Sequence, residues 1–365
     1  MTILDSLLVL CRPGFEADCA AELTQRAAER GMGGYARARQ DAGWLTWHTP
    51  GQEAGVFCVG AAGRRGLIFP RTAWPVADTF SDLPPADRVT PLVAMARPLG
   101  PFSAVRLEYP DTNEGRGLQR FIKGFRQAFE RALKRQGLLQ EVPDESSGRI
   151  LHLFFEDSGR GVMGCADAGQ VSLWENGIPR LRLPAVAPSR SALKLEEAWL
   201  TLMTPAERAH WLRAGRSGVD LGAAPGGWTW QLARHGVRVT AVDHGKLAPH
   251  LLSEYPVTHV AGDAFTWRAP RTLDWLVCDV VDKPSRTLAL MEKWLVNGWA
   301  RVAVFNLKLP MKQRHATVDE LLQRLEAALA SRNTGHSVRA AQLYHDREEI
   351  TVAVVSGDRA GAPAG

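Results

Sequence analysis

Residues 218–228 of this chain, Gly-Val-Asp-Leu-Gly-Ala-Ala-Pro-Gly-Gly-Trp, decide the fold of its second half. The apolar segment that ends at Leu221 predicts a short strand, and a helix is expected to begin at the end of the quoted stretch. Between the two, Gly222, Gly226 and Gly227 let the backbone come within contact distance of a ligand, and the helix N-terminus offers free N–H groups. The alternative is a tight strand-to-helix turn that binds nothing.

Acidic residues follow two further predicted strands. Asp243 comes directly after the apolar run 237–242, and Asp263 follows the run 257–261. The glycine spacing, G-x-x-x-G-G, is neither the G-x-G-x-x-G of dinucleotide sites nor that of a P-loop. At its strand end Asp243 is placed to accept from both hydroxyls of a ribose, and Asp263 from an adenine amino group. A single such Asp is more often a turn residue or helix cap, so the prediction depends on the acids occurring together.

With these two acids, the loop DLGAAPGGW resembles the S-adenosylmethionine site of Rossmann-like methyltransferases over about residues 190–356. Alternating predicted strands and helices from Ser191 onward independently indicate a parallel, doubly wound α/β sheet. The resemblance implies S-adenosyl-L-methionine as the cofactor. The residues that it implies for cofactor binding are Ser191, Gly222, Ala224, Pro225, Gly226, Gly227, Asp243, Asp263 and Asp279.

The residues after the fourth predicted strand usually report which atom is methylated in that superfamily. Residues 274–281, DWLVCDVV, place Asp279 there. They contain neither the N-P-P-Y-like turn of amino-group methyltransferases nor the Pro-Cys nucleophile of cytosine-C5 enzymes. Cys278 is expected to point away from Asp279 into the core, because neighbouring side chains alternate along a strand.

Four residues resemble the Lys-Asp-Lys-Glu set of RNA ribose 2′-O-methyltransferases. Residues 189–197 match the S-R-x-x-x-K-L-x-E helix, and residues 302–309 form an apolar strand that carries the second lysine. In residues 346–352, DREEITV, one step of the family pattern matches Glu348 and another matches Glu349, of which we prefer Glu349. The implied catalytic residues are Lys194, Asp279, Lys308 and Glu349.

This set suits the chemistry of a ribose hydroxyl, which is a poor nucleophile. The protein must align the 2′ oxygen with the methyl group and the sulfur, and must remove or stabilise the hydroxyl proton. Lys308 lies between apolar residues, where burying a lysine that has no functional role would cost free energy. Desolvation and the second cation, Lys194, would lower its pKa so that it acts as a base. No metal is required, and the sequence shows no cluster of metal ligands.

Segments at 7–23, 109–118 and 343–352 resemble the ribosomal large subunit methyltransferase M family. The resemblance spans nearly the whole chain and implies 2′-O-methylation of one cytidine in the peptidyl-transferase region of 23S rRNA. It also implies an N-terminal ferredoxin-like (α+β) domain, a THUMP-type RNA-binding domain and a Rossmann-like methyltransferase domain. Their expected ranges are 1–75, 76–178 and 179–356, followed by a flexible tail at 357–365.

Residues 116–135 carry seven basic side chains and only one acid, Glu130. Such a helix can lie along RNA phosphates, and the alternative is a solvated surface face. The THUMP resemblance favours RNA. The residues predicted to bind it are Arg116, Arg120, Lys123 and Arg126.

Composition sets the remaining limits. With 365 residues, 45% hydrophobic and 23% charged, the chain is too long for one hydrophobic core and too apolar to be disordered. It lacks an apolar run of membrane-spanning length and a signal-peptide pattern, and its five scattered cysteines fit reduced thiols. We therefore expect a cytoplasmic monomer without a membrane partner. The net charge of +5 is only weak evidence for RNA binding.

Two alternatives remain open at this stage. One is an RNA methyltransferase that acts on a base atom, and the other is an RNA-binding ribosome-assembly protein with an inactive methyltransferase domain. The residues alone do not identify the nucleotide, decide between free rRNA and an assembling particle, or fix the oligomeric state.

Overall fold

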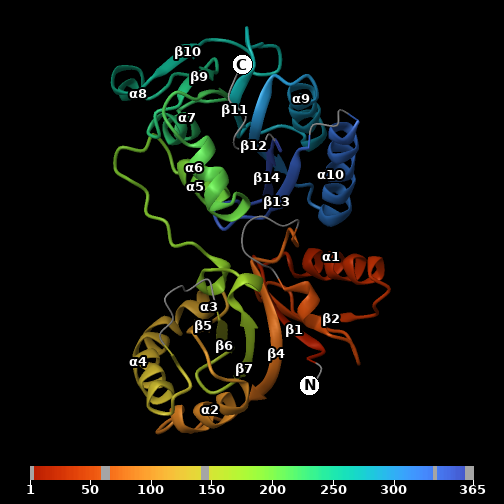
Figure 1. Ribbon diagram of the computed structural model, residues 1–365, viewed down its shortest axis with the longest axis vertical. Coiled ribbons are helices and arrows are strands. Elements are labelled where there is room, and N and C mark those ends of the chain that lie inside the picture. Colours follow the sequence, from red (N-terminus) through yellow and green to blue (C-terminus); the bar gives the residue numbers. More distant parts are fainter. Residues whose placement is uncertain (1–3, 59–65, 141–147, 332–334, 358–365) are drawn as a thin grey trace. The chain divides into compact units, whose positions relative to one another are not determined.

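The computed structural model describes residues 4–58, 66–140, 148–331 and 335–357. The chain forms two compact units, the first ending at Pro179 and the second beginning at Arg180 (Figure 1). Each unit is built on one seven-stranded sheet. The predicted α/β class is confirmed. Among the described residues, no helix has both the length and the apolar character needed to cross a membrane.

The sheet of the first unit has the strand order β2-β3-β1-β4-β7-β6-β5. Its central strand β4 changes partner along its length, pairing with β1 up to Pro75 and with β7 from Val76. The predicted boundary between the first two domains falls at this change, within one continuous strand. The elements are β1 (Ser6–Leu10), α1 (Glu16–Glu29), β2 (Tyr35–Ala38), β3 (Trp44–His48), β4 (Thr72–Phe80), α2 (Val89–Ala96), β5 (Ala104–Glu108), α3 (Asn113–Arg116), α4 (Gln119–Arg135), β6 (Arg149–Phe155) and β7 (Gly161–Asp167).

The sheet of the second unit has the order β10-β9-β8-β11-β12-β14-β13. The first five strands in this order are parallel, and β14 runs antiparallel to both neighbours. The elements are α5 (Ala192–Leu202), α6 (Pro205–Trp211), β8 (Ser217–Leu221), α7 (Gly227–Ala233), β9 (Arg238–Val242), α8 (Pro249–Glu254), β10 (Val257–Val260), β11 (Leu273–Cys278), α9 (Pro284–Val296), β12 (Ala300–Lys308), α10 (Arg314–Ala330), β13 (Ser337–Ala341) and β14 (Glu349–Val355).

Helices cover both faces of this sheet, and its central strands β11, β12 and β14 are accordingly rich in buried apolar residues. The helices α9 and α10 lie on one side and α5 and α7 on the other (Figure 1). On the α5 side, a core cluster contains Val277 of β11, Val304 of β12 and Ala353 of β14. Side chains two residues apart share a face of a strand. The same face therefore continues toward the carboxyl ends of β11 and β12 with polar residues, and these build the site.

Candidate active site

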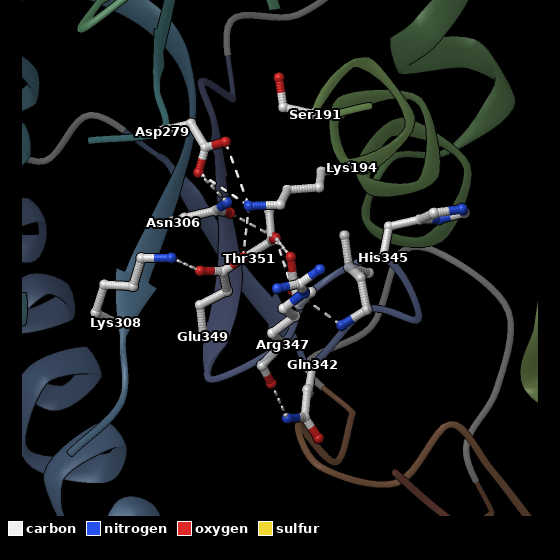
Figure 2. Close-up of polar contacts among 12 residues, drawn as sticks. Ser191, Lys194, Asp279, Asn306, Lys308, Gln342, His345, Arg347, Glu349 and Thr351 are labelled. Atoms are coloured by element: carbon white, nitrogen blue, oxygen red, sulfur yellow. Dashed lines mark hydrogen bonds and ion pairs between the residues drawn. The ribbon is translucent and has the colours of Figure 1, made fainter. Parts of the chain in front are cut away.

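The four predicted catalytic side chains meet at the carboxyl ends of β11 and β12 (Figure 2). Lys194 extends from α5, and its Nζ lies 3.3 Å from each carboxylate oxygen of Asp279 and 2.5 Å from Oε1 of Glu349. The ammonium group of Lys308 forms an ion pair with Oε2 of Glu349. The Glu349 side chain is only 2% exposed. One buried carboxylate therefore bridges two lysines, and Asp279 holds the first of them.

The environment of Lys308 disfavours its charged form relative to that of an ordinary lysine. Burial lowers the pKa of Lys308, and the positive charge of Lys194 lowers it further, whereas Asp279 and Asp346 act in the opposite direction. The Lys308 side chain remains 29% exposed. It therefore combines a lowered pKa with access from solvent, the two properties required of a general base that receives a proton from a bound substrate.

The two adjacent glutamates differ sharply in their surroundings. Glu349 stands opposite Lys308 in the register between β12 and β14, so both side chains lie on the same face of the sheet. Glu348 is 63% exposed and pairs with Arg314 at 3.1 Å. The contacts with both lysines are made by Glu349, the residue that we preferred from the sequence.

The glycines of the 218–228 loop are required by protein packing, a reason that the sequence analysis did not give. Gly222 and Gly226 have φ of +79° and +109°. A Cβ added at Gly222 would lie 2.3 Å from Val280, and one at Gly226 would lie 2.2 Å from Leu251. The loop thus fits tightly between its neighbours, which fixes its backbone beside Asp279.

The predicted cofactor acids make backbone contacts at their strand ends. Asp243 accepts hydrogen bonds from the amides of Ala224 (2.9 Å) and Gly245 (2.7 Å), so it holds the glycine loop to the end of β9. Asp263 is exposed and accepts from the amide of Phe265 at 2.9 Å. Both contacts match the turn and cap roles weighed as the alternative. Each carboxylate oxygen still has a lone pair for a ligand.

Ser191 and Asp220 complete the surroundings of this loop. The hydroxyl of Ser191 lies 2.7 Å from that of Ser189, and its carbonyl accepts from the Trp228 indole at 2.9 Å. Asp220 is buried, accepts from the Thr229 hydroxyl at 2.7 Å, and has a pKa raised to about 7 by burial. Asp220 therefore anchors the helix that follows the loop.

The residues present fit S-adenosylmethionine in their donor and acceptor chemistry. Asp243, Asp263 and Asp279 follow β9, β10 and β11, at the sheet edge where open α/β folds bind ligands. Carboxylates are suited to accept from the hydroxyl and amino groups that this cofactor carries. In the described part of the chain, no group of three or more His, Cys, Asp or Glu side chains is arranged to hold a metal ion.

Sequence reasoning missed three polar residues behind the catalytic set. Asn306 donates from Nδ2 to Asp279 at 2.7 Å, and its Oδ1 lies 2.7 Å from the hydroxyl of Thr351. That hydroxyl is also within 3.2 Å of both carboxyl oxygens of Asp346. Their spacing in the sequence could have indicated two of them, because Asn306 and Thr351 each stand two residues from a predicted catalytic residue in a strand.

The residues predicted to bind RNA fall into two groups. Arg116, Arg120 and Lys123 are exposed, and the latter two lie on α4 away from its buried face. Arg126 instead forms ion pairs with Glu130 (3.3 Å) and Glu175. Its guanidinium thus has acidic partners within the first unit, whereas Arg116, Arg120 and Lys123 are exposed.

Comparisons with known proteins cover nearly the whole chain. Three family models match: the RlmM ferredoxin-like domain at residues 4–73, the N-terminal region of ribosomal RNA large subunit methyltransferase M at 87–167, and FtsJ-like methyltransferase at 187–344. The chain is 47% identical to the ribosomal RNA large subunit methyltransferase M of Alkalilimnicola ehrlichii, covering 94% of this chain and 93% of that protein. It is 43% identical to the proteins of that name from Thauera aminoaromatica (94% of each chain) and Pseudomonas putida (95% and 97%).

Proposed function

Because the chain belongs to the ribosomal RNA large subunit methyltransferase M family, we propose that it methylates a ribose 2′-hydroxyl of 23S rRNA, on one cytidine of the peptidyl-transferase region. It is an rRNA methyltransferase that depends on S-adenosyl-L-methionine, with a ferredoxin-like N-terminal domain and a Rossmann-like methyltransferase domain. The division at residues 75 and 178, and the THUMP character of the middle part, belong to the same proposal.

The observation that carries the proposal is the contact of Lys308 with Glu349 beside the Lys194–Asp279 pair. When bound, the cofactor supplies an electrophilic methyl group on a sulfonium. Lys308, in its neutral form, accepts the proton of the 2′-hydroxyl while the oxygen forms its bond to the methyl carbon. Transfer would leave the electron pair of the broken carbon–sulfur bond on sulfur, and Lys308 would then release its proton to solvent.

The other three residues set the state of that base. Lys194 keeps a positive charge close to Lys308, which disfavours a second one there. Asp279 and Glu349 hold Lys194 in place through contacts of 3.3 and 2.5 Å. Glu349 also contacts the amine of Lys308 and thereby restricts the direction of the amine lone pair. Positioning of this kind is the main need of a reaction whose methyl donor is already activated.

The environment of Cys278 argues against cytosine-C5 methylation. That chemistry needs a thiolate nucleophile, whereas Cys278 is fully buried and burial raises its pKa to about 12. The described residues offer no comparable support for a base-directed reaction. The alternative of an inactive assembly protein is disfavoured by the intact contacts among all four polar residues.

One experiment tests the proposal directly. The protein is incubated with S-adenosylmethionine carrying a radiolabelled methyl group, and with 23S rRNA supplied either free or in assembling particles. The labelled RNA is then digested to nucleosides, and ribose and base methylation are separated. Label in 2′-O-methylcytidine is the expected result. Label on a base would replace the proposal with the first alternative, and no label with either substrate would favour the second.

A further inference from the structure

A column of three buried polar side chains lies directly behind the catalytic residues. Asn306, Thr351 and Asp346 are each at most 1% exposed. Asn306 and Thr351 stand opposite each other in the register between β12 and β14, two residues from the Lys308–Glu349 pair. Burying three such groups is costly unless their hydrogen bonds are satisfied. The donors and acceptors in this column can therefore be assigned.

Asp279 fixes the orientation of the first amide. Its carboxylate can only accept, and Asn306 lies 2.7 Å from Oδ1 of Asp279. The amide nitrogen of Asn306 must face Asp279, so its carbonyl oxygen faces Thr351 at 2.7 Å. That carbonyl oxygen is an acceptor, and the hydroxyl of Thr351 is the donor that it meets.

Thr351 has only one proton to give. If the proton is donated to Asn306, the hydroxyl oxygen of Thr351 meets the carboxyl oxygens of Asp346, at 3.0 and 3.2 Å, as an acceptor. Oδ2 of Asp346 already accepts from the amide of Leu343 at 3.0 Å. A charged Asp346 would therefore set acceptor against acceptor. A proton on Oδ1 of Asp346 relieves the conflict, because Asp346 then donates to Thr351 across the 3.2 Å contact.

We propose that Asp346 is protonated in the folded enzyme and that, through Thr351 and Asn306, it positions the carboxylate of Asp279. The protonation state rests on the hydrogen bonds among these three side chains and the amide of Leu343. The importance of Asp279 for methyl transfer rests on the proposed function. Asp346, Thr351 and Asn306 are thus positioning residues, which act on the reaction through the carboxylate that holds Lys194.

The charges around Asp346 are compatible with a neutral acid. Burial is the largest cause that raises its pKa, to about 8, and the nearby Glu197 of α5 raises it as well. Lys194, also on α5, acts in the opposite direction. Lys308 of β12, Asp279 and the adjacent Arg347 are further titratable groups of this region. A neutral Asp346 does not counter the positive charge of Lys194, so it helps to keep the pKa of Lys308 low.

Paired variants test the column. Asp346→Asn retains a donor toward Thr351 and an acceptor for Leu343, so its methyl transfer is expected to stay within about threefold of the unchanged enzyme. Thr351→Val leaves the carbonyl of Asn306 without its donor, and kcat should fall about tenfold with little change in the KM for RNA. Thr351→Ser keeps the hydroxyl and should restore the rate and its pH profile.

The proton itself can be observed without any assay of activity. At neutral pH, the infrared spectrum of the unchanged protein minus that of Asp346→Asn should contain the carbonyl band of a buried protonated carboxyl group, because any such band from Asp220 is common to both proteins and cancels. Identical spectra, or an Asp346→Asn variant that is unfolded or as slow as Thr351→Val, would overturn the proposal. Absence of ribose methylation by the unchanged enzyme would instead refute the proposed function and leave the infrared result intact.

Discussion

Replacing Lys308 by methionine separates catalysis from folding. Methionine retains the length of the side chain but has no amine to accept a proton. Glu349, which Lys308 contacts, keeps Lys194 as a partner at 2.5 Å, so no buried carboxylate is left unpaired. The cofactor residues at Asp243 and in the glycine loop are untouched. We therefore expect Lys308→Met to fold and to bind S-adenosylmethionine.

The expected magnitudes differ widely between the two properties. Because the Lys308 side chain is 29% exposed, removal of its ion pair should lower the free energy of unfolding by only about 1 kcal/mol. Removal of a general base typically slows a reaction by about 100- to 10,000-fold, or roughly 3–5 kcal/mol in the barrier. Lys194→Met should behave differently, since Asp279 would lose its lysine partner although Glu349 keeps Lys308, and it should destabilise the fold more strongly.

Single-turnover transfer of a radiolabelled methyl group to rRNA measures the chemical step, and calorimetric titration measures cofactor affinity. Lys312→Met is the matched control, because Lys312 is an exposed lysine on the loop that follows β12 and should have no effect. In the unchanged enzyme, the rate should rise with pH as Lys308 loses its proton, in a range below the ordinary lysine pKa. A Lys308→Met variant that transfers methyl at more than about a tenth of the normal rate would refute the assignment of the base.

Three further predictions concern the loop, the buried acid and the RNA surface. Gly222→Ala should lower the free energy of unfolding by about 1–3 kcal/mol through its clash with Val280. Gly298→Ala, at φ +66° with no neighbour within 4 Å, should lower it only by the cost of backbone strain. Equal decreases for the two variants in urea unfolding would argue against the clash. Because the pKa of Asp346 is raised to about 8 from about 3.9 unfolded, the folded state holds a proton that the unfolded state has lost, and stability should fall between about pH 4 and 8. Asp346→Asn should remove this part of the pH dependence, and an unchanged profile in urea unfolding would contradict it. Neutralising Arg120 and Lys123 should weaken RNA binding and reduce the slope of log affinity against log salt concentration by about one for each phosphate that is no longer neutralised. Arg126 is already paired with Glu130 and Glu175, so Arg126→Gln should leave this slope unchanged. A double variant with the original slope would place the RNA elsewhere.

The family resemblance supplied the four candidate catalytic residues. The apolar runs of the sequence placed Asp279 after one predicted strand and Lys308 within another. The choice between Glu348 and Glu349 needed the register between β12 and β14, because only the register decides which of two adjacent side chains faces Lys308. Adjacent residues of a strand point to opposite faces of the sheet. An error of one position would therefore have selected Glu348, which is exposed, in place of Glu349, which is buried and contacts both lysines.

Contacts between distant residues account for what was missed. Asn306 and Thr351 are 45 positions apart in the sequence, and their pairing depends on β14 adding antiparallel to β12. Arg126 belonged to a convincing basic run, yet its guanidinium pairs with Glu175, 49 positions away. The change of partner within β4 likewise depends on β1 and β7, which are far apart in the chain. Local patterns carry no information on such pairings.

The charges of the site are matched to the charge that the reaction removes. When Lys308 is in the neutral form that the reaction requires and Asp346 is protonated, Lys194 faces the two carboxylates of Asp279 and Glu349, and these residues together carry one negative charge. That charge complements the single positive charge of a sulfonium. As the sulfonium charge disappears, the proton taken by Lys308 brings the site itself to neutrality, so the total stays constant throughout the transfer. A charged Asp346 would add a negative charge at both stages, favouring a protonated Lys308 before the reaction begins. The buried proton on Asp346 thus keeps the base available.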